Sequence, residues 1–97
     1  MKYFPGLFIT FEGIEGTGKS THARRLYAFL EENGHPVLFT AEPGGTEVGD
    51  QIRSILLHPK TGEIDAITEL FLFEASRREH VLHVIQPALQ SGRIVLC

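Results

Sequence analysis

The stretch FEGIEGTGKST at residues 11–21 constrains the fold of this chain more than any other part of the sequence. Gly13, Gly18, Lys19 and Ser20 fit the pattern G-x-x-x-x-G-K-[ST], in which backbone N–H groups fold around a phosphate. Glycine suits such a loop because a side chain would hold the anion away from the backbone. The loop requires a strand before it and a helix after it, so it predicts an α/β domain.

Hydrophobic periodicity predicts both flanking elements and a second strand beyond them. LFITFE at 7–12 is short, apolar and rich in aromatic and β-branched residues, which favours a strand. A helix is expected from Lys19 to about Asn33, with Gly34 ending it in a left-handed conformation. One face of this helix carries its apolar residues, Ala23, Leu26, Tyr27 and Leu30. PVLFT at 36–40 is the next expected strand, which predicts a parallel pair with a right-handed crossover.

The second half of the sequence continues this alternation. EPGGT at 42–46 is a turn, and its Thr46 can cap a helix that ends near Leu57. A polar connection follows at 58–65.

A long helix is then expected from near Asp65 to about Gln90, with Pro87 kinking it or splitting off its last turn. Gly92 closes this helix, and RIVLC at 93–97 forms a third strand. The expected fold is therefore α/β, three-layered, with a parallel sheet and helices on both faces.

Composition and charge limit the classes of function. With 97 residues, 42% hydrophobic and 22% charged, the chain fits one small globular domain. Its formal net charge of −3 gives no general attraction for nucleic acid or acidic membranes. No apolar stretch approaches the ~20 residues of a membrane helix. The single cysteine, Cys97, is expected to be a buried strand residue; one cysteine forms no internal disulfide, which suits a cytoplasmic protein.

The glycine-rich loop predicts a nucleoside triphosphate as ligand, with a chance match of the pattern as the alternative. The helix that begins at Lys19 adds the positive end of its dipole. Lys19 can reach the β- and γ-phosphate oxygens, and the Ser20 hydroxyl can ligate Mg²⁺. The expected binding residues are Gly13, Ile14, Glu15, Gly16, Thr17, Gly18, Lys19 and Ser20.

Four motifs in order resemble the N-terminal half of bacterial thymidylate kinases: FEGIEGTGKST, EPGGT, ELFLFEASRREH and IQPALQSGRIVLC. The resemblance covers nearly the whole chain and implies an incomplete P-loop nucleotide kinase fold that transfers the γ-phosphoryl group of ATP to dTMP, with Mg²⁺. It implies that residues 1–97 are the N-terminal part of one kinase domain, without the C-terminal half and its lid, and that the full-length protein is a homodimer. The family strand order 2-3-1-4-5 implies that the strand at 7–12 is an edge strand in this chain.

The resemblance also assigns roles within the phosphate loop. Lys19 and Glu15 are the expected catalytic residues, and Glu15 would reach the 3′-hydroxyl of the acceptor nucleotide. A carboxylate opposes phosphate binding by itself, so an acceptor hydroxyl explains Glu15; a solvated loop tip is the alternative. Gly16 stands where some family members carry an arginine close to the transferred phosphate. With glycine at this position, the chain resembles members that supply the corresponding arginine from the lid.

Phe73 and Arg77 match the family residues that stack on thymine and hydrogen-bond its edge. Their i, i+4 spacing places both on one helical face. The expected helix carries Leu70, Phe73, Arg77 and Val81 along one stripe. Periodicity alone favours a core position for Phe73, whereas burial of the Arg77 guanidinium in this stripe would be costly without a partner. Glu42 is expected in the acceptor pocket, with turn chemistry as its alternative, and Ala41 stands where many members carry arginine.

The remaining polar residues carry weaker expectations. His80 and His83 at i, i+3 can chelate a metal in principle, but solvated helix positions are expected for both. Arg24 and Arg25 are expected on a solvated helix face. Two other functions stay open: another P-loop nucleoside or nucleotide kinase, and a nucleotide-binding switch module without an acceptor.

Overall fold

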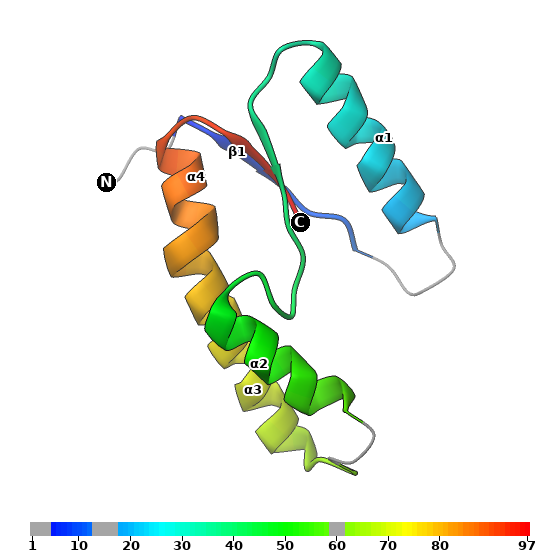
Figure 1. Cartoon of the computed structure of the whole chain (residues 1–97), viewed down its shortest axis with the longest axis vertical. Helices are drawn as coiled ribbons and strands as arrows, with labels where there is room; N and C mark the ends of the chain where they lie inside the picture. Colours follow the sequence, from blue (N-terminus) through cyan, green and yellow to red (C-terminus); the bar gives the residue numbers. More distant parts are fainter. Residues whose placement is uncertain (1–4, 13–17, 59–61) are drawn as a thin grey trace. The chain divides into compact units, whose positions relative to one another are not determined.

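The computed structural model describes residues 5–12, 18–58 and 62–97. The chain forms two compact units, Met1–Thr40 with Pro87–Cys97, and Ala41–Gln86 (Figure 1). The elements in chain order are β1 (Leu7–Ile9), α1 (Lys19–Glu32), β2 (Val37–Phe39), α2 (Glu47–Leu57), α3 (Ala66–His80), the π-helical turn η2 (Val81–Ile85), α4 (Gln86–Gln90) and β3 (Ile94–Leu96).

A parallel three-stranded sheet with the order β1-β3-β2 forms the centre of the first unit. Val95 of β3 lies opposite Phe8 of β1 on one side and Leu38 of β2 on the other. The predicted parallel pairing and the insertion of the third strand between the other two are confirmed. Val95 and Leu96 are fully buried, as expected for a central parallel strand with both faces covered.

The strands are shorter than the sequence predicted. Each has three residues, although hydrogen bonds continue beyond their ends. Phe11 N–H donates to the carbonyl of Cys97, and Thr40 N–H donates to the carbonyl of Leu96, both over 2.9 Å. Cys97 lies one residue beyond β3 and is half-buried, so the expectation of a buried strand residue was wrong.

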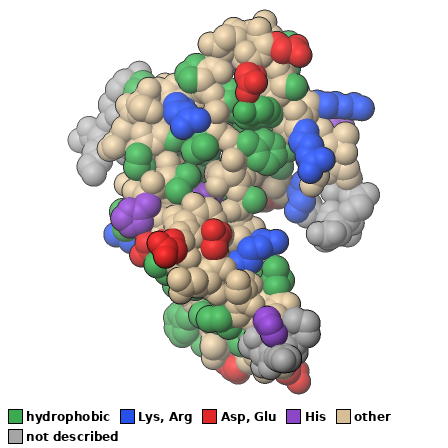
Figure 2. All heavy atoms as spheres, viewed as in Figure 1, with side chains coloured by type: hydrophobic (Ala, Val, Ile, Leu, Met, Phe, Trp, Pro, Cys, Tyr) green, Lys and Arg blue, Asp and Glu red, His purple; other side chains and the backbone are tan. Residues whose placement is uncertain are grey.

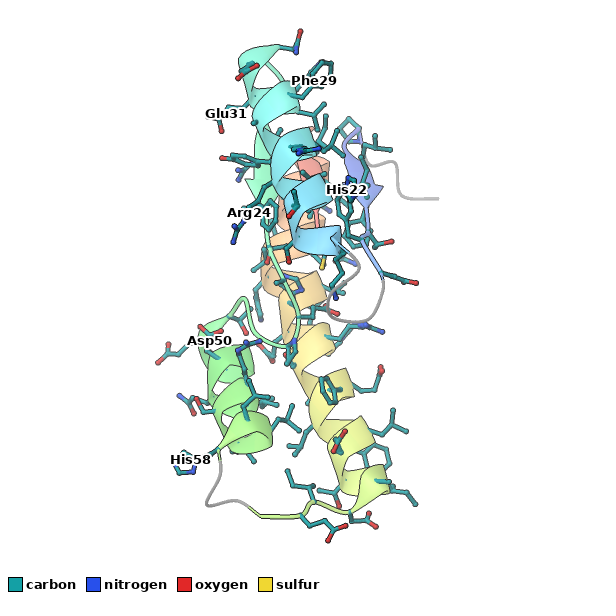
Figure 3. All side chains as sticks on the ribbon, turned by 90° about the vertical axis from the view of Figure 1, so that its right-hand side faces the viewer. His22, Arg24, Phe29, Glu31, Asp50 and His58 are labelled. Carbon is teal, nitrogen blue, oxygen red and sulfur yellow. The ribbon has the colours of Figure 1, made fainter. Side chains whose placement is uncertain are left out.

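Helices cover both faces of this sheet, with α1 on one side of the strands and α4 on the other (Figures 1 and 3). On α1, Ala23 is buried, and the ring of Tyr27 meets the ring of Phe39 edge to face at 5.8 Å. The predicted solvated face is confirmed, since Arg24 and Arg25 are exposed and Figure 3 shows Arg24 pointing away from the ribbon.

The chain segment directly before β1 lies close to the C-terminal end of α4. The N–H of Gly6 donates to the carbonyl of Leu89 over 3.0 Å, and a Cβ at Gly6 would collide with the carbonyl oxygen of Arg93. Glycine is therefore required where this backbone approaches another so closely. Beyond it, β1 pairs with β3 alone among the described strands, and Leu7 and Phe8 are exposed. The predicted edge position of this strand is confirmed.

The second unit consists of α2 packed against α3, and both helices begin with a side-chain cap. The Thr46 hydroxyl accepts the N–H of Gly49 over 2.9 Å, which confirms the predicted cap, and the Asp65 carboxylate caps α3 in the same way. Gly49 is buried, and a Cβ there would lie 3.2 Å from the Ser76 hydroxyl. Gly49 therefore lets α2 approach α3 closely.

The long helix predicted from 65 to 90 is helical throughout, with a π turn in place of a break. In this turn the N–H of Gln86 donates to the carbonyl of Val81, five residues back. Pro87 follows and has no N–H to donate, so the predicted irregularity lies directly before it. Gly92 ends the helical segment with a φ of +87°, as predicted. None of the helices in the described part of the chain has the length and apolar character that crossing a bilayer requires.

Candidate functional site

The described end of the phosphate loop lies at the start of α1. Gly13, Ile14, Glu15, Gly16 and Thr17 fall outside the described residues. Gly18 has a φ of +81°, a left-handed conformation that favours glycine, and Lys19 opens the helix as predicted.

The first turn of α1 has the charge pattern of an anion site. It contains no acidic residue, and Gly18 has no side chain with which to cap it. The positive end of the α1 dipole is thus not neutralised by a carboxylate of its own first turn. Lys19 is half-buried and Ser20 is exposed. This arrangement can bind phosphate at the helix N-terminus.

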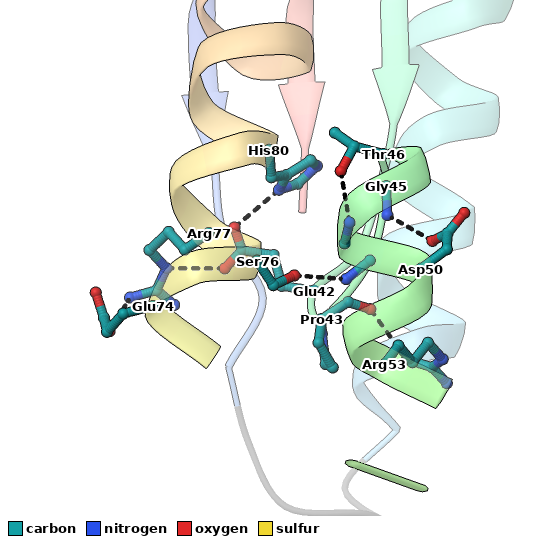
Figure 4. Close-up of polar contacts among 12 residues, drawn as sticks. Glu42, Pro43, Gly45, Thr46, Asp50, Arg53, Glu74, Ser76, Arg77 and His80 are labelled. Carbon is teal, nitrogen blue, oxygen red and sulfur yellow. Dashed lines mark hydrogen bonds and ion pairs between the residues drawn. The ribbon is translucent and has the colours of Figure 1, made fainter. Parts of the chain in front are cut away.

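Glu42 and Arg77 meet in the second unit, although 35 positions separate them in the sequence (Figure 4). Arg77 Nε donates to Glu42 Oε1 over 2.9 Å. The Arg77 side chain is 61% exposed and that of Glu42 is 19% exposed. We assumed from the sequence that the Arg77 guanidinium is buried. This assumption was wrong, because Arg77 meets its partner at the surface.

His80 lies on the other side of the same carboxylate. Its Nδ1 is 2.8 Å from Glu42 Oε2, and its side chain is fully buried (Figure 4). The expectation of a solvated His80 was wrong, because the EPGGT turn covers this side of α3. His83 is exposed as predicted and pairs with Glu79.

The rest of the EPGGT turn is hydrogen-bonded to both helices of its unit (Figure 4). Gly44 N–H donates to the buried Ser76 hydroxyl over 3.0 Å, and Gly45 N–H donates to the Asp50 carboxylate over 3.1 Å. Arg53 Nη1 donates to the carbonyl of Pro43 over 3.2 Å. The backbone donors of Gly44 and Gly45 thus serve the protein's own side chains.

Phe73 lies on α3 one turn before Arg77 and is 39% exposed. Periodicity alone favoured a core position, and this exposure contradicts it. An exposed ring followed four residues later by a fixed guanidinium offers a flat apolar surface and a planar hydrogen-bond donor on one helical face. Such a pair can take a planar ligand that has an acceptor at its edge.

The charge of Glu42 depends on its two partners. Burial by itself raises the pKa of this carboxyl, but the hydrogen bonds from His80 and Arg77 and the positive charge of the Arg77 guanidinium outweigh burial. The pKa of Glu42 therefore lies below its ordinary value, and the carboxylate is ionised at neutral pH.

Sequence reasoning missed Ser76 and His80, both fully buried polar side chains. Their i, i+4 spacing places them on one face of α3. Two polar residues at this spacing were a signal that this face of α3 meets a polar loop. That signal did not indicate which loop.

Of the predicted site residues, the structure therefore places Gly18, Lys19 and Ser20 at the start of α1 in the first unit. It places Glu42, Phe73 and Arg77 in the second unit and joins Glu42 to Arg77.

The thymidylate kinase family model matches residues 11–97. Over 90 residues the chain is 57% identical to the thymidylate kinase of Syntrophotalea carbinolica, and over 91 residues 52% identical to that of Desulfosudis oleivorans. These matches cover 93% and 94% of this chain but 42% of each relative.

A solved structure gives the same result for the fold. The crystal structure of thymidylate kinase from Ehrlichia chaffeensis superposes with a TM-score of 0.86 at 41% identity, over 95% of this chain and 52% of that one. Together with the match over residues 11–97, this similarity shows that the chain belongs to the thymidylate kinase family and has its P-loop kinase fold.

Proposed function

We propose that this protein transfers the γ-phosphoryl group of ATP to dTMP, giving ADP and dTDP. The observation that carries the proposal is the exposed Phe73 beside an Arg77 that Glu42 holds at Nε. Family membership and the phosphate-loop geometry at the start of α1 support it further.

The phosphate loop is the donor side of the proposed site. Gly13 to Ser20 bind the phosphates of ATP, with Lys19 at the β- and γ-phosphate oxygens. Glu15 holds the 3′-hydroxyl of the acceptor nucleotide. Lys19 and Glu15 are the proposed catalytic residues of this chain.

Ser20 is the proposed ligand for Mg²⁺. Its hydroxyl oxygen is a ligand type that Mg²⁺ prefers, and its exposure leaves room for the waters that the ion keeps. When bound, Mg²⁺ offsets negative charge on the β- and γ-phosphates.

The acceptor side of the site is proposed on α3 and the EPGGT turn. Phe73 stacks on the thymine ring, and Arg77 donates a hydrogen bond to its edge. Both oxygens of Glu42 are occupied, one by Arg77 and one by His80. Glu42 therefore serves the acceptor pocket by orienting Arg77.

We further propose that the intact protein is a cytoplasmic homodimer and that residues 1–97 form the N-terminal part of its single kinase domain. Apolar side chains on α3 support the pairing: Ile67, Leu70 and Phe71 are 64%, 54% and 67% exposed and lie at i, i+3, i+4. Figure 2 shows hydrophobic side chains reaching the surface in the lower part of the view, over α2 and α3. An exposed stripe of this kind is typical of an interaction surface.

The test is a phosphoryl-transfer assay on the intact protein with ATP and four acceptors, dTMP, dUMP, dCMP and AMP. The proposal expects dTDP as the product with the highest kcat/KM. Preference for another acceptor would assign the protein to a different nucleotide specificity. ATP binding without any acceptor binding would favour a nucleotide switch.

A further inference from the structure

We infer that His80 is a positioning residue for the acceptor site: it fixes the Glu42 carboxylate, and Glu42 in turn fixes Arg77. The inference rests on the proposed function and adds to it a residue that acts on the acceptor site through Glu42. His80 Nδ1 lies 2.8 Å from Glu42 Oε2, so His80 can influence Arg77 through this carboxylate.

The Glu42 carboxylate has a separate hydrogen-bond partner for each of its two oxygens. Arg77 is 61% exposed, and an exposed arginine–carboxylate pair alone holds a long side chain weakly. His80 is fully buried on the same helix, so its ring cannot move as a surface side chain does. With Oε2 bound to His80 and Oε1 bound to Arg77, the carboxylate plane is fixed at both ends. The direction of the Arg77 Nε–H bond is then fixed as well.

The hydrogen bond also explains why a histidine is buried here. A buried imidazole without a partner would be unfavourable, and Nδ1–H donation to a carboxylate satisfies one of its two ring nitrogens. An apolar residue would pack at position 80 but would leave Oε2 of Glu42 without this donor. Glu42 could then rotate, and Arg77 with it.

The test measures steady-state kinetics of the intact protein for four variants: His80→Leu, His80→Asn, Glu42→Gln and the double variant His80→Leu with Glu42→Gln. His83→Leu is the matched control, because His83 is an exposed histidine on the next turn. His80→Leu is expected to raise KM for dTMP about 10-fold, the effect of a lost hydrogen bond to a charged group. KM for ATP is expected to stay within about 2-fold.

Two further results are expected if His80 acts through Glu42. His80→Asn restores most of the dTMP affinity, because the asparagine N–H can take the place of Nδ1–H. In the Glu42→Gln background, His80→Leu changes KM for dTMP by no more than about 2-fold.

Three outcomes would overturn the inference alone while the wild type still binds dTMP: an unchanged KM in His80→Leu, no recovery in His80→Asn, or full additivity with Glu42→Gln. Equal losses for ATP and dTMP with a lower Tm would also overturn it, because they indicate a purely structural role. If His80→Leu does not fold, the comparison of His80→Asn with Glu42→Gln decides. A wild type that does not bind dTMP would overturn the proposed function, and this inference with it.

Discussion

The chain contains two glycine-rich segments that each lead into a helix, and the two helices differ in the capping residue and the charges of their first turns. Before α2, Thr46 caps the helix, and Glu47 and Asp50 place two carboxylates in its first turn. Before α1, the residue in the cap position is Gly18, and the first turn has no acidic residue. The amides of Gly44 and Gly45 bond to Ser76 and Asp50 of the same unit.

The difference shows that glycine content alone does not identify a phosphate site. The EPGGT turn has its own acceptors for its backbone donors and its own charges for the α2 dipole. Among the described residues, the first turn of α1 has no carboxylate and Gly18 provides no side-chain cap, an arrangement that favours an anion at this helix N-terminus. The distinguishing signal is the presence or absence of acidic and capping side chains in the first turn.

The largest expected effect comes from removing the cation at the start of α1. Lys19→Ala is expected to lower kcat/KM for phosphoryl transfer by at least about 100-fold, because charge on the transferring group loses its counter-charge. The measurement is the initial rate of dTDP formation. Arg24→Ala is the control, since Arg24 is exposed on the same helix. Equal losses in both variants would mean that the start of α1 has no special role.

A smaller effect is expected on the acceptor side. Arg77→Ala should raise Kd for dTMP by about 10-fold or more through loss of a charged hydrogen bond. Affinity for ATP should not change, and calorimetric titration with each nucleotide measures both values. Arg78→Ala, on the neighbouring exposed position, should change neither. An unaltered dTMP affinity in Arg77→Ala would remove this residue from the acceptor site.

Removing the Thr46 side chain that caps α2 tests how much this cap stabilises the protein. Thr46→Ala is expected to lower the free energy of unfolding by about 1 kcal/mol, because Gly49 N–H loses its acceptor. Thr46→Ser retains the hydroxyl and should remain close to wild type. Chemical denaturation of the three proteins provides the comparison, and a loss in the serine variant as large as in the alanine variant would point to packing instead.

The complementary change gives α1 the charge that α2 already has. Thr21 is exposed in the first turn of α1, and Thr21→Glu is expected to stabilise the protein without nucleotide by about 0.5 kcal/mol. The same carboxylate should weaken ATP binding by competing for the dipole. Ala28→Glu places the charge on an exposed mid-helix position and should do neither. Tighter ATP binding in Thr21→Glu would contradict the contrast between the two helix starts.

The smallest expected effect is a dependence of stability on pH from Glu42. Its pKa in the folded protein lies below the ordinary value of 4.5, so the ionised form is favoured by folding. This contribution is complete above the unfolded-state pKa and is lost as the pH falls through the folded-state pKa. Thermal unfolding of wild type and Glu42→Gln at several pH values should therefore converge as the medium becomes more acidic than pH 4.5. Divergence in that range would reverse the sign of the shift.

Sequence patterns predicted the parallel direction of the strands and the helix starts at Lys19, Thr46 and Asp65, because these depend on local chemistry and on short periodic patterns. The order of the strands was implied by the resemblance to thymidylate kinases and not by these patterns. It did not predict the burial of His80 or the exposure of Arg77. Both depend on where a loop nearly 40 residues away folds back onto α3, and periodicity along one helix contains no such information.

The π turn at Val81–Ile85 has a consequence for how sequences of this kind can change in length. The buried residues Ser76, His80 and Ile85 are separated by four and then five positions, and the five-residue step spans this turn. Loss of one codon here would leave a four-residue step, the ordinary α-helical spacing, and the same face would still point inward. A deletion between Ser76 and His80 would instead rotate Ser76 away from His80. Among related sequences, the number of residues is therefore expected to vary in the segment that corresponds to 81–85 and to stay constant between Ser76 and His80.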